Sequence, residues 1–526
     1  MKNFFENIKK REKIIIFLIF SFAIYSAIAI GQAWDERAHL IHGKITLDYM
    51  LSLGKNNQET LYRENYSTLY WSTLYLLTKI LPLKYEIQIT HLINLIFSLS
   101  TIYGIKKLVG EIFNKDVGKI VFLLLFFYPV FFGHMGINSK DTILAFSHVW
   151  VSYLIFRYLK NQNHKNKVNK YLLSIGVLAA MATGIQLVFL GSLIPIILLV
   201  FFDIFFIKKI TKNNFILKKF LFDLIKCFVI FYFFLILFWI DTYPNIFFLP
   251  FEFLASTFSE TYWTGWPYNL LNGIYYDSNN IPKHYLITNF IFKSPEYILI
   301  LYFLFLVYFL KNSLFFNKKF KVFNYKIVFI ISVLIFPNLI LFFIPYPVYD
   351  GMRLFIWTLP YLCIIPGLSL YYLYKNIESN FSKLTTIFLS LMIVYFLYNF
   401  FQITPYQYTY LNSLNGEKSE RYKKFENDYW GTSLEELIKK SSLLKSEYYY
   451  VGTCGTSTKL VKKISKKYGY KNFKFVNEKD ADLIIMTNRV TLKNNIMTNC
   501  FDKYDGKNIT EVKRGSLILS SIRKIR

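Results

Sequence analysis

Asp35 and Glu36 are the residues best placed for chemistry, because these adjacent carboxylates follow directly on an apolar run from about residue 14 to residue 30. A carboxylate within hydrogen-bond reach of a hydroxyl acts as a general base. The run comes close to the length that spans a bilayer at about 1.5 Å per residue. Basic residues at positions 9, 10, 11 and 13 hold the N-terminus in the cytoplasm, so we expect the acidic pair on the outer face. Two solvated charges at a helix end are the alternative interpretation.

Other ionisable side chains are predicted on the same face, in loops or at the ends of apolar runs. Ionisable groups at span boundaries are costly and tend to mark function, above all in a cluster. Taken singly, Lys140 or Arg353 also fits a snorkelling anchor, and His134 a satisfied interface histidine. With the acidic pair, the predicted substrate-binding set is His39, His134, Lys140, Asp141, Lys283, Asp350 and Arg353.

Carboxylates beside cations on the outer face are typical of group transfer from a lipid-linked phosphate. A cation near the phosphate neutralises the charge that develops in the transition state. Attack opposite the phosphate inverts the anomeric centre, whereas retention requires a second carboxylate as nucleophile. Asp35, Glu36 and Asp141 also form an oxygen-rich set of the kind that Mg²⁺ or Mn²⁺ prefers. A divalent cation therefore stays open, although no metal site and no cofactor is predicted.

The composition places these residues in a polytopic membrane protein. The chain has 526 residues, is 54% hydrophobic and 20% aromatic, and has a mean hydropathy of +0.32. Those values are too apolar for an ordinary soluble protein. The formal charge of +28 lies largely in short loops between apolar runs, where the positive-inside rule explains it, so no nucleic-acid partner is predicted. Heavy use of Lys, Asn, Ile, Phe and Tyr indicates an AT-rich bacterial genome.

About eleven runs are predicted to cross the membrane, with the N-terminus inside. The inner loops are rich in Lys and Arg, whereas the outer loops at 31–85 and 241–295 are longer, aromatic and acid-containing. The first outer loop contains an amphipathic, aromatic segment that is expected to lie in the membrane interface, LYWSTLYLLTKILP. The predicted spans are about 14–30, 86–105, 119–136, 142–157, two within 171–207, 222–240, 296–310, 327–345, 354–374 and 384–401.

Residues 403–526 contain no spanning run and form the second predicted domain, after a membrane domain over 1–402. Strands are predicted at YYYVGTCG, NFKFV and ADLIIMTN, and an amphipathic helix at TSTKLVKKISKKYG. The tail is therefore expected to be a small α/β domain on the outer side. Cys454 and Cys500 both lie in it and would be able to pair in an oxidising compartment.

Five motifs carry a family resemblance: Trp34-Asp35-Glu36, Asn138-Ser139-Lys140-Asp141, Tyr349-Asp350-Gly351-Met352-Arg353, PYQYTYLN from Pro405 and ENDYWGTS from Glu426. Together they resemble the GT-C membrane glycosyltransferases. Within that superfamily they look like family 39, the relatives of protein O-mannosyltransferases and aminoarabinose transferases. The fold implied is a helical GT-C bundle in the bacterial inner membrane, with the active site and the tail facing the periplasm.

The resemblance implies a sugar donor linked to a polyprenyl phosphate. Asp35 would be the catalytic base and Glu36 a supporting group on the acceptor or sugar. Lys140, Asp141 and Arg353 would line the donor site, with Lys283 as a further phosphate ligand. The β-trefoil insertion of eukaryotic O-mannosyltransferases has no counterpart here, which argues against protein O-mannosylation. The acceptor stays open among lipid, polysaccharide and protein.

Two other classes of function are alternatives to glycosyl transfer. A transporter or flippase for lipid-linked sugars is the alternative function, but transporters place charges near the midplane and often contain inverted repeats. Here the charges cluster on one side and no internal repeat is evident. A scaffold anchored by its helices would leave those boundary charges unexplained.

Overall fold

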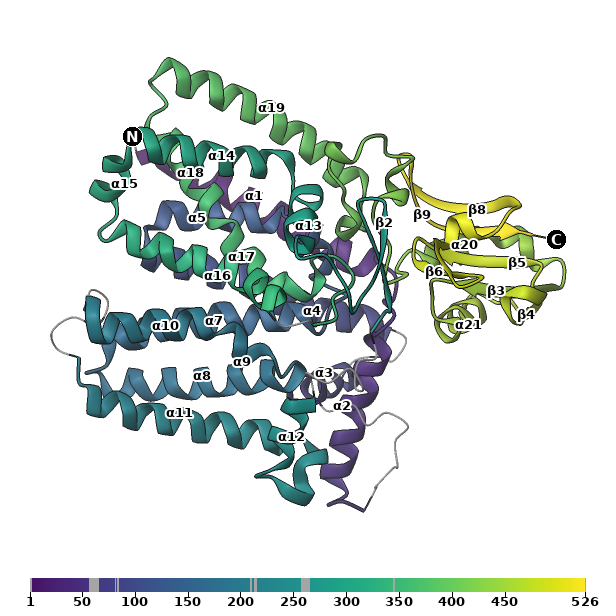
Figure 1. The fold of residues 1–526 in the computed structure, drawn as a ribbon, viewed down its shortest axis with the longest axis horizontal. Coiled ribbons are helices and arrows are strands. Elements are labelled where there is room, and N and C mark those ends of the chain that lie inside the picture. The colour runs from purple at the N-terminus through teal and green to yellow at the C-terminus, as the bar shows by residue number, and fades with distance from the viewer. Residues whose placement is uncertain are drawn as a thin grey trace.

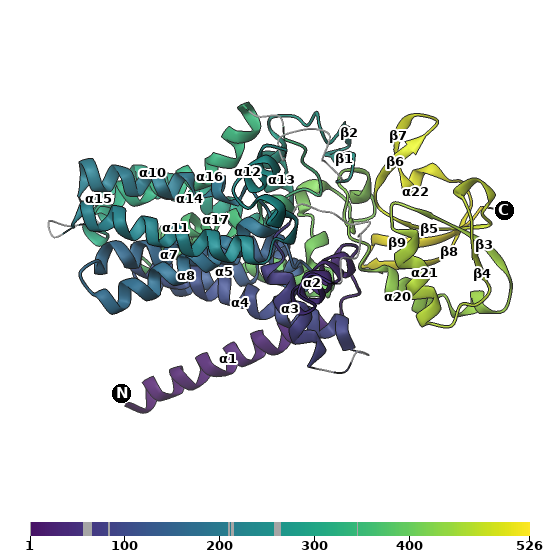
Figure 2. The same ribbon diagram turned by 90° about the horizontal axis from the view of Figure 1, so that it is seen from below.

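The computed structural model describes residues 2–55, 66–80, 82, 85–208, 211, 215–256, 265–343 and 346–525, with side chains from residue 13. Long helices pack side by side over most of the molecule, and the chain ends in a sheet at one end of them (Figure 1). The N-terminus lies at the opposite end of the helices from that sheet (Figures 1 and 2).

Seven described helices are long and apolar enough to cross a membrane, or eight if the bent pair α13–α14 counts as one span. On helices such as α11 and α19 much of the apolar surface is exposed, as expected for side chains that face lipid. The seven are α4 (Glu86–Ile112), α7 (Asp141–Asn161), α8 (Lys165–Ile185), α11 (Leu217–Leu237), α16 (Phe323–Phe343), Arg353–Lys375, which includes α17 (Leu359–Leu362) and α18 (Ile364–Lys375), and α19 (Asn380–Gln402).

The predicted count of eleven spans is not confirmed, although each predicted run contains α-helix in its described residues. The run at 119–136 is divided into α5 (Lys115–Phe126) and α6 (Pro129–His134). Proline has no N–H to donate and disfavours helical conformation in the residue before it, which explains the break. The apolar part of α1 (Lys2–Ala29) and the segment Ile194–Ile207, which includes α10 (Ile194–Phe202), are shorter than the other candidate spans. The chain bends by 112° between α13 (Tyr285–Lys293) and α14 (Glu296–Lys311).

The described parts of the two predicted outer loops form short elements at the end of the long helices that is nearer the C-terminal sheet (Figures 1 and 2). The first loop contains α2 (Glu36–Leu51) and α3 (Leu69–Lys79), and α3 coincides with the predicted amphipathic segment. The second contains α12 (Leu249–Ser256) and the hairpin β1 (Tyr268–Leu271) and β2 (Ile274–Asp277).

The C-terminal sheet has five strands in the order β4-β3-β5-β9-β8. β3 (Tyr449–Cys454) pairs in parallel with β4 (Phe473–Phe475) and β5 (Leu483–Thr487), whereas β9 (Leu517–Lys524) runs antiparallel to β5 and β8 (Lys507–Arg514). The three predicted strands and the predicted helix, α21 (Thr458–Lys467), are confirmed. α20 (Leu434–Lys440), α22 (Cys500–Lys503) and the hairpin β6 (Val490–Lys493) and β7 (Ile496–Asn499) complete the tail.

The tail and the helices share a continuous packed region. Ile30 and Ile137, from the helical part, belong to the same apolar cluster as the tail residues. A Cβ atom on Gly31 would lie 2.3 Å from the carbonyl oxygen of Thr432, so only glycine permits this approach of the two backbones. Residues such as Tyr410 and Phe425 in turn belong to the core of the helical part. The first residues after 402 are therefore packed with the helices.

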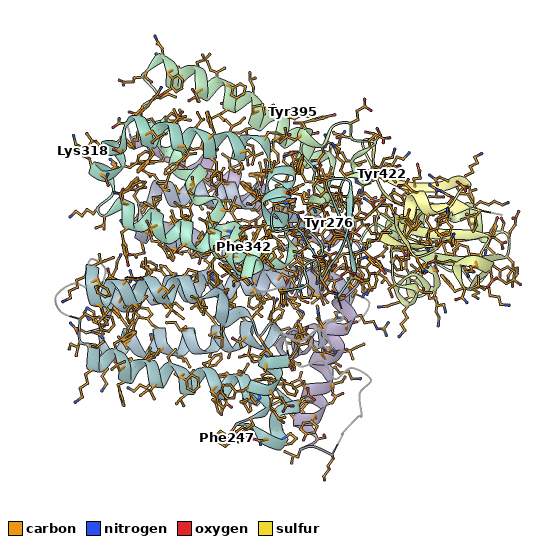
Figure 3. All side chains as sticks on the ribbon, in the orientation of Figure 1. Phe247, Tyr276, Lys318, Phe342, Tyr395 and Tyr422 are labelled. Carbon is orange, nitrogen blue, oxygen red and sulfur yellow. A yellow bond between two sulfur atoms is a disulfide. The ribbon has the colours of Figure 1, made fainter. Side chains whose placement is uncertain are left out.

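Basic residues gather at the end of the helices remote from the sheet. Arg157 and Lys160 both contact Glu111 there, at 2.7 Å and 3.0 Å. Phe113 packs against Phe320, close in sequence to Lys318, which Figure 3 places at the same end of the molecule. The molecule thus has a basic end and an opposite end that carries the sheet.

Candidate functional site

A cavity of about 590 Å³ lies where the helices meet the C-terminal sheet. Its wall is built from α2 and the residues just before it, the loops that precede α3 and α7, the turn before Arg353, and the tail. It contains five of the nine predicted site residues, Asp35, His39, Lys140, Asp350 and Arg353. Segments that are distant in sequence therefore meet around one space.

Arg353 is the centre of the charged groups in this wall. Its guanidinium contacts Asp350 at 2.8 Å, Asp141 at 3.0 Å and Asp35 at 3.2 Å. The Arg353 side chain is 5% exposed, and its guanidinium lies 4.4 Å from the centroid of the Trp430 ring. The carboxylates of Asp141 and Asp350 are buried, whereas that of Asp35 is 36% exposed. Asp35 is thus the member of this network that faces the cavity most openly.

The turn that presents Asp350 has an uncommon backbone. Asp350 and Gly351 both adopt positive φ angles, 60° and 65°. Such angles are uncommon outside glycine, although aspartate is among the residues that tolerate them best. The Gly351 amide donates to the hydroxyl of Tyr285 at 2.9 Å, which holds the turn. The two Asp350 oxygens point to different partners, Oδ2 to Arg353 and Oδ1 to Arg489 at 2.6 Å.

The segment Asn138–Asp141 is held by its first residue. The Asn138 side-chain oxygen accepts from the amides of Lys140 at 3.0 Å and Asp141 at 2.8 Å, and its Nδ2 donates to Asp141 at 2.9 Å. This arrangement begins α7 and directs Asp141 toward Arg353. Lys140 points into the cavity and donates to the hydroxyl of Tyr66 at 2.8 Å. Burial by itself would lower the pKa of Lys140, but Tyr66, Tyr349 and Asp141 raise it above its ordinary value, so the amine is charged.

Two histidines on α2 face the same cavity. His39 stacks on the ring of Trp71 at 4.4 Å, and its Nδ1 lies 2.8 Å from the hydroxyl oxygen of Ser139. Burial and the nearby Lys140 lower the pKa of His39 well below its ordinary value. The same two causes lower the pKa of His42 to about 4. Both rings are therefore neutral at neutral pH and serve as polar rather than charged groups.

The remaining predicted residues do not line the cavity. Glu36 is turned toward α4, where Oε1 lies 2.7 Å from Nε2 of His91 and Oε2 accepts from the amide of Ala33 at 2.7 Å. Its side chain is 1% exposed. His134 is buried behind the wall, 2.8 Å from the hydroxyl of Tyr429, and Lys283 is exposed, with its amine 3.8 Å from the Phe342 ring.

The side chains of Asp35 and Glu36 point in different directions and therefore join different groups of residues. Asp141 pairs with Arg353 together with Asp35, but Glu36 does not join them. The oxygen-rich set of Asp35, Glu36 and Asp141 is therefore not brought to one point. Within the ranges that the structure describes, no group of three or more His, Cys, Asp or Glu residues is arranged to hold a metal ion.

Arg489, which the sequence reasoning missed, comes from the tail. It follows the all-buried strand β5, and only 3% of its side chain is exposed. Its guanidinium contacts Asp350 at 2.6 Å, lies 3.7 Å from Glu426 and stacks 4.3 Å above the ring of Trp266. A lone arginine directly after a buried apolar strand was the signal available in the sequence.

The comparisons with known proteins identify the fold. No protein-family model and no curated protein sequence matches the chain. Among solved structures, ArnT from Cupriavidus metallidurans in the apo state aligns with a TM-score of 0.52 and 11% identity, over 98% of each chain. ArnT bound to undecaprenyl phosphate aligns with a TM-score of 0.49 and 10% identity over the same shares. The apo oligosaccharyltransferase of Archaeoglobus fulgidus gives 0.49 and 10%, over 89% of this chain and 65% of that one.

The chain is therefore a membrane protein with the GT-C type of fold, as the resemblance of its motifs implied. The particular fold it shares, from end to end, is that of ArnT. Identity at this level establishes the fold and does not establish the reaction.

Proposed function

We propose that the protein is a glycosyltransferase that moves a sugar from a polyprenyl-phosphate donor to an acceptor hydroxyl in the cavity. One observation carries the proposal. Asp35 faces the cavity while Arg353, fixed by the buried carboxylates of Asp141 and Asp350, holds it in place. A base whose position is set by a rigid ion-pair network is what proton abstraction in such a transfer requires.

In the proposed reaction Asp35 accepts the proton of the acceptor hydroxyl. The acceptor oxygen forms a bond to the anomeric carbon while the bond between that carbon and the phosphate oxygen breaks. The electron pair of the broken bond stays on the polyprenyl phosphate, whose negative charge increases. Attack opposite the leaving phosphate inverts the anomeric centre, which needs only one carboxylate at the reacting atoms. Glu36, turned toward His91, then serves to fix the start of α2.

Lys140 is the cation best placed to receive the phosphate. Arg353 already contacts three carboxylates, so its charge is largely matched within the protein. The described hydrogen-bond partner of the Lys140 amine is instead the neutral hydroxyl of Tyr66. A charged amine beside the leaving oxygen stabilises the charge that develops there. His39, neutral and on the same wall, is suited to a hydroxyl of the sugar.

The cavity is proposed to open on the periplasmic side of a bacterial inner membrane. The basic end of the helices is remote from the sheet, and Lys and Arg favour the cytoplasmic side. The tail contains the disulfide Cys454–Cys500, and disulfides persist in oxidising compartments. Both features support the tail and the cavity facing outward.

The test is a transfer assay with purified protein in lipid vesicles. A radiolabelled polyprenyl-phosphate hexose is offered to total envelope acceptors, with wild type beside Asp35→Asn. The control is Asp48→Asn, because Asp48 lies on α2, the helix that Asp35 precedes, but is paired only loosely at the surface, 4.0 Å from Lys44. We expect label to move into an acceptor with wild type and the control, and not with Asp35→Asn.

Transfer by Asp35→Asn at the wild-type rate would refute the role of Asp35. If wild type leaves the label on the lipid, a leaflet-accessibility assay with the same vesicles distinguishes the alternative, a flippase that moves the donor across the membrane. The chemical class of the labelled acceptor, whether lipid, polysaccharide or protein, identifies the natural acceptor class.

A further inference from the structure

Arg489 connects the C-terminal sheet to the network that holds Asp35. Its guanidinium donates to Oδ1 of Asp350 at 2.6 Å and to the carbonyl of Tyr429 at 2.9 Å. Asp350 offers its other oxygen to Arg353 at 2.8 Å. Arg489 is buried and lines the cavity. A residue of the tail therefore binds one carboxylate oxygen of Asp350, and Arg353 binds the other.

The contact lengths indicate what this occupation does. Of the three carboxylates on Arg353, Asp350 is the nearest and Asp35, at 3.2 Å, the farthest. An arginine and a carboxylate prefer a bidentate pairing in which both oxygens bind the same guanidinium. With Oδ1 released, Asp350 is free to turn both oxygens to Arg353 and draw it away from Asp35. Arg489 prevents that rearrangement.

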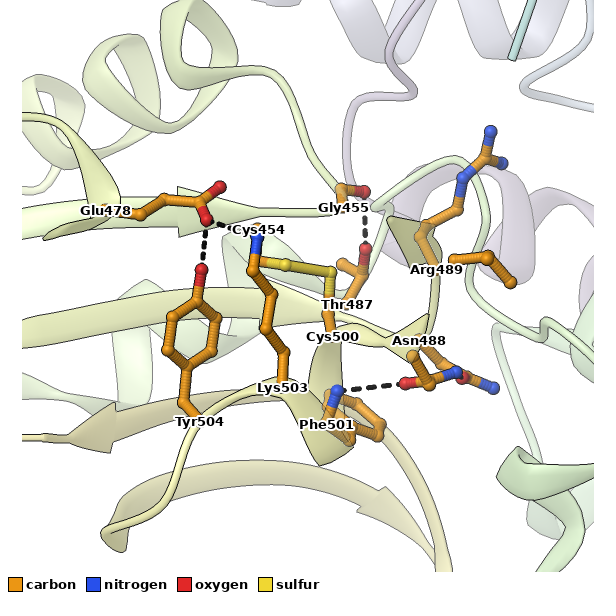
Figure 4. The surroundings of a disulfide bond; sticks show 12 residues. Cys454, Gly455, Glu478, Thr487, Asn488, Arg489, Cys500, Phe501, Lys503 and Tyr504 are labelled. Atoms are coloured by element: carbon orange, nitrogen blue, oxygen red, sulfur yellow. Dashed lines mark hydrogen bonds and ion pairs between the residues drawn. A yellow bond between two sulfur atoms is a disulfide. The ribbon is translucent and has the colours of Figure 1, made fainter. Parts of the chain in front are cut away.

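The tail holds Arg489 from both sides. Cys454 ends β3 and is bonded to Cys500, whose amide donates to the carbonyl of Arg489 at 2.9 Å. Gly455 lies so close that a Cβ atom on it would be 2.7 Å from Cβ of Arg489. Its carbonyl accepts from the hydroxyl of Thr487 at 2.7 Å. Figure 4 shows the disulfide and Gly455 beside the backbone from which the Arg489 side chain projects.

We propose that Arg489 is a positioning residue for transfer: it holds Asp350 so that Arg353 keeps Asp35 in place, and the Cys454–Cys500 disulfide fixes Arg489. The C-terminal domain is then part of the catalytic unit rather than an appendage. This inference rests on the proposed function for its kinetic consequence, whereas its structural consequence is measurable without any sugar donor.

The kinetic experiment compares Arg489→Ala with Arg514→Ala in full-length protein. Arg514 is a matched control, because it is also a tail arginine with a carboxylate and a carbonyl partner, Glu436 at 2.6 Å and Thr404 at 2.8 Å, but does not line the cavity. We expect Arg489→Ala to lower kcat about 100-fold, because small misplacements of a reacting group cost that much, and to leave KM for the donor within about threefold. Arg514→Ala should change kcat less than about threefold.

Chemical rescue separates positioning from general destabilisation. Millimolar methylguanidinium should restore part of kcat to Arg489→Ala by filling the vacated place beside Asp350 and should not affect Arg514→Ala. Replacing Cys454 and Cys500 together by serine should lower kcat about tenfold with KM unchanged. Equal losses in Arg489→Ala and Arg514→Ala without rescue, or no loss in either, would overturn the proposal.

Hydrogen exchange tests the same inference independently of activity. The amides of Gly351 and Arg353 donate to Tyr285 and to the carbonyl of Asp350. We expect Arg489→Ala to accelerate exchange in the segment 349–356 at least about tenfold, because the turn loses its anchor, and Arg514→Ala to leave it unchanged. Unchanged exchange in Arg489→Ala refutes the positioning. Accelerated exchange in a protein whose wild type transfers no sugar refutes the proposed function alone.

Discussion

Replacing Arg353 by methionine removes the cation that three carboxylates share, in a side chain of similar length. Breaking a buried ion pair by removal of one partner costs about 3–5 kcal/mol, since a charge is left buried without compensation. Other contacts reduce the cost here. In the variant, Asp350 still contacts Arg489, Asp141 still accepts from the side-chain amide of Asn138, and Asp35 is exposed enough to be hydrated. We therefore expect a loss near the lower limit, about 3 kcal/mol.

The control for this prediction is Arg157→Met at the basic end. Arg157 contacts Glu111 at 2.7 Å, but both side chains are partly exposed, and Glu111 keeps Lys160. An ion pair of this kind contributes about 1 kcal/mol or less. Both variants remove one arginine from one helical protein, so the difference between them isolates burial and the number of carboxylates left behind.

A thiol-reactive fluorogenic dye measures both variants in detergent. Cys363 is a free and fully buried thiol, so it reacts only when the helices around it separate. The half-buried Cys227 is replaced by serine in every protein compared. A loss of 1 kcal/mol lowers the unfolding midpoint by about 2 °C, at the lower end of the range for domains. Arg353→Met should therefore lower the unfolding midpoint by roughly 6 °C and Arg157→Met by about 2 °C or less. Equal decreases of the unfolding midpoint in the two variants would show that the network around Arg353 stabilises the protein no more than a surface ion pair does.

Two further predictions concern single groups of the site. Burial raises the pKa of Glu426 to about 7, although Arg489 opposes the rise. The protonated form of Glu426 therefore adds to the stability of the fold below about pH 4.5, and this contribution is lost as the pH rises through about 7. Glu426→Gln should therefore flatten the pH profile of the unfolding midpoint between pH 5 and 8, and a profile as steep as that of wild type would contradict this. Lys140→Gln can still form a hydrogen bond to Tyr66 and should fold, but its kcat for transfer should fall about 100-fold. The control, Lys44→Gln, replaces an exposed lysine and should not change kcat. Equal rates in the two variants would exclude Lys140 as the phosphate ligand.

The sequence predicts where apolar helices lie better than how many of them cross the membrane. Hydropathy counts apolar residues along a run and does not register a change of direction within it. The run at 119–136 contains Pro129, which divides it into α5 and α6. The chain also bends by 112° between α13 and α14, where one span was expected to begin. Short polar elements such as α2 and the hairpin β1–β2 have weak patterns and were not predicted.

The sequence indicates that several site residues converge, but not which partners hold them. Asp35, Lys140, Asp350 and Arg353 come together because each stands at the same end of an apolar run, a property that is visible in the sequence. Glu36 is adjacent to Asp35, but neighbouring residues on a helix point about 100° apart, so only one of them faces the cavity.

The local sequence marks Arg489 as an arginine that follows a buried strand, but it does not predict which groups Arg489 contacts. Its place depends on how the sheet docks on the helices, through contacts such as that between Gly31 and Thr432. Docking of this kind arises from long-range packing, for which a single sequence contains no periodic signal.

The arrangement of charges explains why such a costly network would be retained. The carboxylates of Asp141, Asp350 and Glu426 are buried, and their partners Arg353 and Arg489 are buried with them. Hydrophobic residues of similar volume would often be at least as stable as buried ion pairs. A fixed network has a different advantage at a reacting centre: its dipoles and charges are already oriented when charge moves, so no reorganisation is needed at that moment. Because Asp35 is the one carboxylate of the Arg353 cluster that reaches well into the cavity, the buried members act on any acceptor proton only through the position they give it.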